Sequence, residues 1–123
     1  MATWVVDAFN VIGCRPDGWW RDRPGAVLAL VRQVQRWTAR EGVPCVVVVD
    51  GRPAPDLPEG MHAGVLVLYD RHADDRIVAW VAAHAAGEPV RVVTGDRALQ
   101  ARLAPHGAIL EGPGHFRTLL EGA

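Results

Sequence analysis

Four of the nine aspartates in this sequence stand at the point where a valine-rich run ends. Each directly follows such a run, and the four are Asp7, Asp50, Asp70 and Asp96. The carboxyl ends of parallel strands meet at one edge of an open α/β sheet, which is where ligands usually bind. If the runs are parallel strands, the sequence predicts a gathering of carboxylates at that edge.

Two further acids, Asp74 and Asp75, open the predicted helix that follows the third of these strands. Carboxylates crowded at one edge repel one another and raise each other's pKa. A divalent cation removes that conflict, and a ligand set made only of oxygen atoms favours Mg²⁺ or Mn²⁺. The pattern therefore predicts a metal-dependent enzyme that acts on phosphate esters.

The residues beside these acids indicate how a site would be built. Asn10 follows Asp7 by three residues, so its amide could orient a phosphate oxygen or a water molecule, although an ordinary Asp/Asn turn has the same pattern. Only one of Asp74 and Asp75 can cap the helix that they open. We favour Asp74 as the acid that faces the site, because it stands three residues before Ile77, a predicted core residue; the choice between the two acids stays open.

The fourth strand ends in a similar pattern, with Thr94, a glycine, Asp96 and Arg97 at the start of the next helix. Asp96 could cap that helix or face the site. Gln100 lies one turn further on, where it could orient substrate or water. Asp50 is a predicted metal ligand or a more distant acid of the site, whereas Asp70 is predicted to be a solvated turn residue.

A loop that carries adjacent tryptophans is the clearest candidate for contact with nucleic acid. Trp19 and Trp20 precede Arg21 and Arg23, and aromatic rings beside arginines suit stacking on bases together with phosphate binding. The alternative is that one or both rings pack the loop onto the domain. All 13 basic residues are arginines, so every basic phosphate contact must come from a guanidinium group. Other arginines predicted at the same edge are Arg15, Arg52 and Arg97.

Length and composition set broad limits. A chain of 123 residues and 13.3 kDa suits one domain, residues 1–123, with its own core. A net charge of −1 gives by itself no electrostatic reason to expect either nucleic acid or an anionic membrane as partner, and no apolar run is long enough to span a membrane. The two cysteines lack metal-binding spacing, which favours a reducing, cytoplasmic location.

The expected fold is α/β, with a central, mainly parallel sheet flanked by helices. Valine-rich runs predict strands over residues 3–6, 44–49, 64–69 and 90–95, and a short apolar run predicts a last strand over residues 108–110. Helical spacing predicts helices over residues 24–41, 74–86, 97–103 and 115–120. Residues 8–23 and 52–62, rich in glycine and proline, are predicted to be irregular.

Several classes are excluded by what the sequence lacks. It has neither GxGxxG nor GxxxxGK[ST], so no dinucleotide or P-loop site is indicated. A phosphoacceptor receiver domain relies on a lysine, which this chain does not have. A haloacid-dehalogenase-type phosphatase would carry Asp-x-Asp after the first strand, where this chain has Asp7, Ala8 and Phe9.

Four segments, taken in order, resemble the NYN branch of the PIN-like nucleases. The similarity is greatest to the YacP-like group, in which the Asp17–Arg21 loop and the Gly112–Phe116 tail also have counterparts. The four segments are residues 5–10, 48–51, 73–77 and 93–97. The resemblance implies a PIN-like three-layer sandwich that cleaves RNA with one or two Mg²⁺ or Mn²⁺ ions. It places the family's acids on Asp7, on Asp74 or Asp75, and on Asp96, with Asn10 beside them.

The sequence thus leads to the hypothesis of a cytoplasmic, metal-dependent endoribonuclease that uses a metal-activated water. Asp7, Asp74 and Asp96 are expected to hold the first ion, with Asp75 and Asp50 left for a second ion or for the surroundings of the first. The expected partner is RNA, including ribosome-associated mRNA, and the chain is expected to be a monomer or a weak homodimer. The alternative is a non-catalytic RNA- or ribosome-binding module with the same fold. Expected substrate contacts are Arg15, Trp19, Trp20, Arg21, Arg23, Arg52, Thr94, Arg97 and Gln100.

Overall fold

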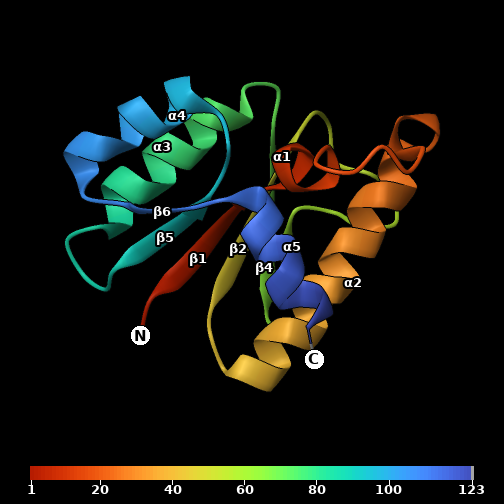
Figure 1. Ribbon diagram of the computed structural model, residues 1–123, viewed down its shortest axis with the longest axis horizontal. Helices are drawn as coiled ribbons and strands as arrows, with labels where there is room; N and C mark the ends of the chain where they lie inside the picture. The colour runs from red at the N-terminus through yellow and green to blue at the C-terminus, as the bar shows by residue number, and fades with distance from the viewer. Residues whose placement is uncertain (123) are drawn as a thin grey trace.

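Six strands form one sheet in the computed structural model, which describes residues 1–122 (Figure 1). The strand order across the sheet is β3-β4-β2-β1-β5-β6, and every neighbouring pair is parallel except β3 and β4. The central position of β1 brings its carboxyl end between those of β2 and β5. The strands are β1 Thr3–Asp7, β2 Cys45–Asp50, β3 Gly60–His62, β4 Val65–Asp70, β5 Val90–Val93 and β6 Ile109–Glu111.

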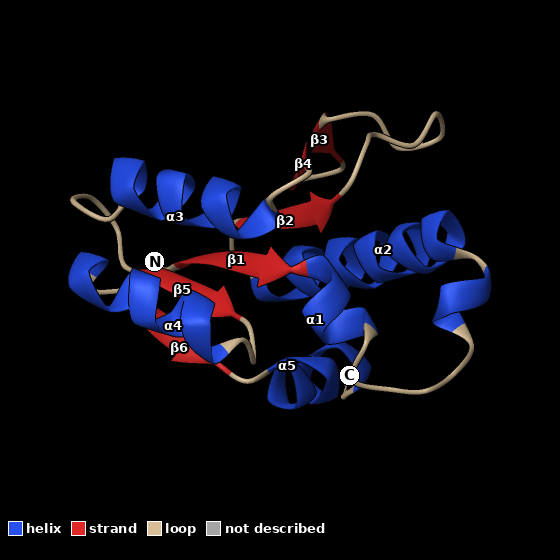
Figure 2. Cartoon of the chain, turned by 90° about the horizontal axis from the view of Figure 1, so that it is seen from above, coloured by secondary structure: helices blue, strands red, loops and turns tan. Residues whose placement is uncertain are grey.

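Helices cover both faces of the sheet, so the expected three-layer α/β architecture is confirmed. Viewed from above, α3 and α4 lie on one side of the strands, and α1, α2 and α5 lie on the other (Figure 2). The helices are α1 Ala8–Ile12, α2 Arg23–Glu41, α3 Ala73–His84, α4 Arg97–Leu103 and α5 Pro113–Glu121.

The valine-rich runs form central strands because both of their faces are buried. Side chains alternate along a strand, so Val6 and Val47 pack beneath α2 and α5, whereas Val5 and Val46 pack beneath α3 and α4. This alternation sets the direction of Asp7 at the end of β1 as firmly as it sets that of the valines.

Two segments predicted to be irregular contain regular structure. Helix α1 begins directly after β1, and a short 3₁₀ turn covers Trp19–Arg21. The second segment contains β3, which forms a hairpin with β4 through Ala63 and Gly64, both with positive φ. Such two-residue hairpin loops favour asparagine, aspartate or glycine at both positions. Because the first position here is Ala63, the sequence does not predict the turn.

Long helix α2 begins and ends where its sequence signals predict. The Asp22 carboxylate accepts a hydrogen bond from the Gly25 backbone N–H, and Pro24 occupies the first turn, where a missing N–H costs nothing. Gly42, with φ of 66°, ends the helix in the left-handed conformation. Across residues 1–122, none of the helices combines the length and apolar character needed to cross a membrane.

Candidate active site

The carboxyl edge of the sheet carries a hollow of about 460 Å³ that the predicted acids line. Its walls come from the end of β1, the end of β2, the start of α3 and the start of α4. The acids that line it are Asp7, Asp50, Asp74, Asp75 and Asp96. We call this the acidic hollow. Chain segments up to 89 positions apart in sequence therefore meet at one edge, because parallel strands all end there.

Asp7 is the most buried acid of the hollow, with 8% of its surface exposed. Its pKa is raised from 3.8 to about 6, chiefly by burial and also by the Asp74, Asp96 and Asp50 carboxylates, while a hydrogen bond from Thr94 lowers it. That bond runs from the Thr94 hydroxyl to Asp7 Oδ2 over 2.9 Å. A buried carboxylate with three acidic neighbours favours a bound proton or a bound cation.

Asp74 and Asp75 have different surroundings. Asp74 lies in the first turn of α3, and both burial and the nearby Asp96 charge raise its pKa. Asp75 points to α4, where its carboxylate forms an ion pair of 2.8 Å with Arg102, and its side chain is 64% exposed. Of these two acids, Asp74 is therefore the one that interacts with Asp7 and Asp96.

Asp96 caps α4 and also lines the hollow. Its Oδ1 accepts hydrogen bonds from the backbone N–H groups of Ala98 at 2.9 Å and Leu99 at 3.1 Å. Its own backbone N–H donates to the Thr94 hydroxyl oxygen over 3.1 Å. Only Oδ2 is left for a ligand. Asp70, in contrast, accepts a hydrogen bond from the His72 N–H and so supports the turn that leads into α3.

Asn10 ties α1 to the turn before α4. Its Oδ1 accepts a hydrogen bond of 2.8 Å from the Gly95 N–H, and a Cβ at Gly95 would lie only 3.1 Å from that oxygen. The close approach explains the glycine. Because Oδ1 is engaged, the amide nitrogen is the group of Asn10 left for a ligand, which suits the positioning of a phosphate oxygen better than the binding of a metal ion.

Thr94 and Gln100 were predicted to contact substrate, but in the structure their side chains bond to other groups of the protein. Thr94 is completely buried, with its hydroxyl between Asp7 and Asp96. Gln100 donates a hydrogen bond of 2.9 Å to the Thr94 carbonyl oxygen. Thr94 therefore orients Asp7 and Asp96 directly, and Gln100 in turn holds the backbone of Thr94. The reason is that β5 ends one residue before Thr94, at the level of Asp7, so its side chain points into the protein.

The donor chemistry of the hollow fits a hard divalent cation. In the described part of the chain, no three aspartate, glutamate, histidine or cysteine side chains converge closely enough to hold an ion. The acids around the hollow nevertheless offer carboxylate oxygens, which Mg²⁺ and Mn²⁺ prefer, and burial together with neighbouring carboxylates raises the pKa values of Asp7 and Asp74. A divalent cation would offset both effects. Asp7, Asp74 and Asp96 would hold such an ion only if their carboxylates came closer together than they lie here.

The arginines predicted to bind substrate occupy three different settings. Arg15 forms an ion pair with Glu121 near the end of α5, which takes it away from the acidic hollow. Arg23 lies over the rings of Phe9 and Trp19, at 5.7 and 5.4 Å from the ring centres. Arg52 lies near Asp50, whereas Arg21 and Arg97 are exposed.

Five residues that line the hollow were not among the predicted site residues: Phe9, Arg71, His72, Ala73 and Arg102. Phe9 lies in the first turn of α1, two residues after Asp7, while Arg71 follows the tip of β4 and Arg102 lies in the last turn of α4. Arg71 could have been found, because it directly follows a strand-tip aspartate. Arg102 could not, because only the packing of α4 against α3 brings it to Asp75.

The sequence left open whether Trp19 and Trp20 pack the loop onto the domain or contact nucleic acid, and the structure gives the two rings different surroundings. Trp19 packs against Phe9, with ring centres 5.9 Å apart, and joins the edge of the core beneath α2. Trp20 meets Trp19 edge-on and is 49% exposed. Packing therefore accounts for Trp19, and Trp20 is the ring available to a partner.

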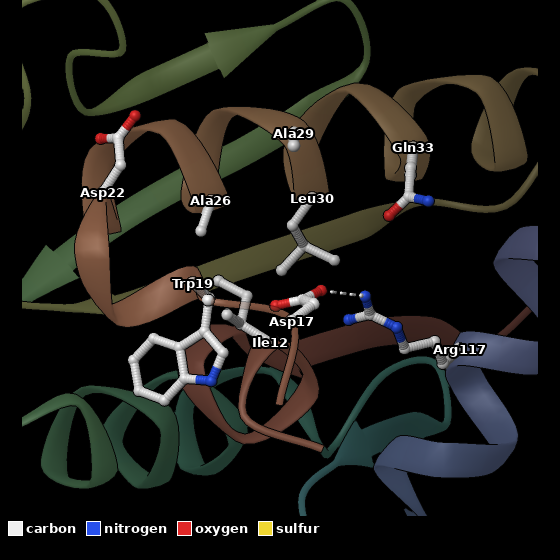
Figure 3. A pocket seen from close by; sticks show the side chains of 10 residues that line it. Ile12, Asp17, Trp19, Asp22, Ala26, Ala29, Leu30, Gln33 and Arg117 are labelled. Atoms are coloured by element: carbon white, nitrogen blue, oxygen red, sulfur yellow. Dashed lines mark ion pairs between the residues drawn. The ribbon is translucent and has the colours of Figure 1, made fainter. Parts of the chain in front are cut away.

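A separate hollow of about 280 Å³ lies on the other side of Trp19, between α2 and the loop that follows α1 (Figure 3). Asp17 and Arg117 approach each other there, with 3.5 Å between carboxylate oxygen and guanidinium nitrogen, and Arg117 also donates to the Val11 carbonyl. None of the acids of the acidic hollow lines it. These contacts hold the loop that carries Trp19 and Trp20 against α5.

A mainly parallel sheet with aspartates at the ends of β1 and β2 and at the starts of α3 and α4 is the arrangement expected of a nuclease-type domain of the PIN-like class. The family model of the YacP-like NYN domain matches residues 4–122, and the chain belongs to that family. The predicted family membership is thus confirmed.

Two crystal structures of Rae1 (YacP) from Bacillus subtilis share the fold. The chain aligns with a mutant of that protein at a TM-score of 0.82 and with another structure of it at 0.80, with 22% sequence identity in both cases. Each alignment covers 99% of this chain, and 76% and 75% of the respective Rae1 chains. No curated protein matches the chain.

Proposed function

We propose that residues 1–123 form one metal-dependent endoribonuclease domain that acts on RNA in the cytoplasm. The observation that carries the proposal is the gathering of Asp7, Asp50, Asp74 and Asp96 around one hollow, where burial and the neighbouring carboxylates raise the pKa of Asp7 to about 6. Such an arrangement destabilises the protein without a counter-charge, and a divalent cation supplies one. Family membership supports the nuclease part of the proposal.

Each side chain of the site then has a defined task. Asp7, Asp74 and Asp96 hold Mg²⁺ or Mn²⁺, which when bound lowers the pKa of a water and stabilises the charge that develops on the phosphate. Thr94 holds Asp7 in place, and Asn10 directs its amide nitrogen at the substrate phosphate. Arg71, at the rim of the hollow, binds a flanking phosphate of the RNA backbone.

The alternative is a non-catalytic RNA- or ribosome-binding module. Such a module would place its carboxylates against RNA phosphates with no benefit, since like charges repel. The buried Asp7 and its three acidic neighbours favour the enzyme. Ribosome-associated mRNA as substrate, and a monomeric or weakly dimeric state, stay predictions from the sequence.

The test is a cleavage assay on end-labelled RNA and single-stranded DNA with Mn²⁺, Mg²⁺ or EDTA. Wild-type protein should cut RNA internally with either metal and should not cut it in EDTA. Asp7→Asn should lose the activity, and Asp56→Asn, an exposed aspartate outside the acidic hollow, should keep it. Binding of RNA without cutting in every metal condition would favour the alternative module.

A further inference from the structure

A small, largely apolar cavity adjoins the acidic hollow on the side of α2. It has a volume of about 130 Å³ and shares two wall residues, Phe9 and Asp50, with the acidic hollow, so the two are neighbours. Its apolar walls come from Phe9, Pro24, Val27, Ala54 and Tyr69, and we call it the apolar slot. A ligand in the slot would therefore lie next to the acids that are proposed to bind the metal ion.

The walls of the slot offer contact area and few hydrogen bonds. The one hydroxyl among these walls, that of Tyr69, already donates to the Leu57 carbonyl over 2.6 Å. Phe9 presents an aromatic ring that is only partly buried. Asp50 is the hydrogen-bond acceptor at the end that faces the acidic hollow. The slot thus suits a flat apolar group that carries polar atoms along one edge.

Two guanidinium groups line the same slot. Arg23 is held over the Phe9 and Trp19 rings, and Arg52 follows β2 directly after Gly51. Within residues 1–122, neither arginine forms an ion pair with a carboxylate. Their positive charge is therefore available to an anionic ligand, and the stacked guanidinium of Arg23 is already oriented by the rings below it.

The combination selects one class of ligand. An apolar peptide side chain would gain nothing from two unpaired arginines, and a free phosphate would gain nothing from the apolar walls. A nucleotide uses both, because its base stacks on aromatic and apolar surfaces while its phosphates bind guanidinium groups. The exocyclic amine of a base would also have an acceptor in Asp50.

We propose that the apolar slot holds one unpaired nucleobase of the RNA, from the nucleotide next to the phosphodiester bond that is cut. The inference rests on the proposed function for its substrate. It specifies that the RNA is single-stranded at the cleavage position, because a base inside a helix would first have to leave its stack.

The slot is tested by binding in EDTA, where the RNA stays intact. Single-stranded RNA oligomers of equal length, each with one abasic ribose at a different position, are titrated into wild-type protein. One abasic position should weaken binding about 10-fold, within the range for a single stacked base, while its neighbours change binding less than 3-fold. Equal binding of all the oligomers would overturn the proposal, whatever the variants below do.

Ala54→Phe fills the slot from its partly buried rim. The variant should bind intact RNA about 10-fold more weakly than wild type and should be insensitive to the critical abasic position, because the two changes remove the same contact. Ala29→Phe is the matched control, since it makes the same substitution in the separate hollow of Figure 3. Unchanged RNA binding by a folded Ala54→Phe would contradict the slot.

The outcomes also separate this inference from the proposed function. If wild type cuts RNA with Mn²⁺ but no abasic position matters, the nuclease stands and the slot is wrong. If one abasic position and Ala54→Phe act as expected but no metal supports cutting, the slot stands and the proposed nuclease activity is wrong.

Discussion

The Thr94 hydroxyl and the Asp7 carboxylate form a buried hydrogen bond of 2.9 Å between residues 87 positions apart. The bond fixes the carboxylate at the floor of the acidic hollow, and it is the contact that opposes the upward shift of the Asp7 pKa. The same hydroxyl oxygen accepts from the Asp96 N–H, so one threonine orients two of the proposed metal-binding acids.

Thr94→Val should remove this orientation while it keeps the shape of the side chain. We expect the Asp7 pKa to rise above its present value of about 6, because the hydrogen bond favours the charged form. Folding stability should fall by roughly 1–3 kcal/mol, since the buried Asp7 carboxylate and the part-buried Asp96 N–H each lose a partner. NMR titration of the carboxylate checks the pKa, and a thermal melt checks the stability. Thr94→Ser keeps the hydroxyl and is the control; an unchanged Asp7 pKa in Thr94→Val would contradict the interpretation.

Asp7→Asn should make the metal-free protein more stable at neutral pH. The folded-state pKa of about 6 lies above the ordinary 3.8, so the folded state binds this proton more tightly than the unfolded chain. The free energy of unfolding therefore falls as the pH rises from about 4 through 6, and the substitution removes this loss, worth about 3 kcal/mol at pH 7.5.

Melting curves in EDTA at pH 4.5 and pH 7.5 measure this difference. Addition of Mn²⁺ at pH 7.5 should raise the melting temperature of wild type and leave that of Asp7→Asn nearly constant. A wild-type response to Mn²⁺ in the variant would remove Asp7 from the proposed metal site.

Asp74 and Asp75 should respond differently to the same substitution. Asp74→Asn should lower RNA cleavage at least about 100-fold, as expected for the loss of a metal ligand. Asp75→Asn should lower it less than about 5-fold, because this exposed carboxylate is paired with Arg102 and such pairs contribute little. Cleavage rates at saturating Mn²⁺ measure both. Equal losses would show that both acids take part.

Substitution by alanine should affect RNA binding at Trp20 and folding stability at Trp19. Trp20→Ala should weaken RNA binding by about 1–3 kcal/mol, with a melting temperature close to that of wild type, because its ring is half exposed. Trp19→Ala should instead cost roughly 2–3 kcal/mol of folding stability, somewhat less than a fully buried aromatic residue. A melt and an RNA titration in EDTA check both variants. Loss of stability in Trp20→Ala without any change in RNA binding would contradict this division.

Much of the fold could be predicted because its signals are local. The valine-rich runs of β1, β2, β4 and β5 are recognisable without any tertiary contact, as is the Asp22 cap that starts α2. A parallel arrangement then requires the acids that end these strands to share one edge. Helix α1 and strand β3 could not be predicted, because α1 has only five residues and β3 depends on its pairing with β4.

The residue types and their order thus determined, by themselves, that Asp7, Asp50 and Asp96 come together at one edge of a sheet. Only the tertiary structure decided what each oxygen does there. Thr94 bonds to Asp7, Asn10 to Gly95 and Asp75 to Arg102, and each pair joins elements far apart in the chain. The physical reason is that strand and helix signals act between neighbours in sequence, whereas the partner of a side chain is set by the packing of whole layers.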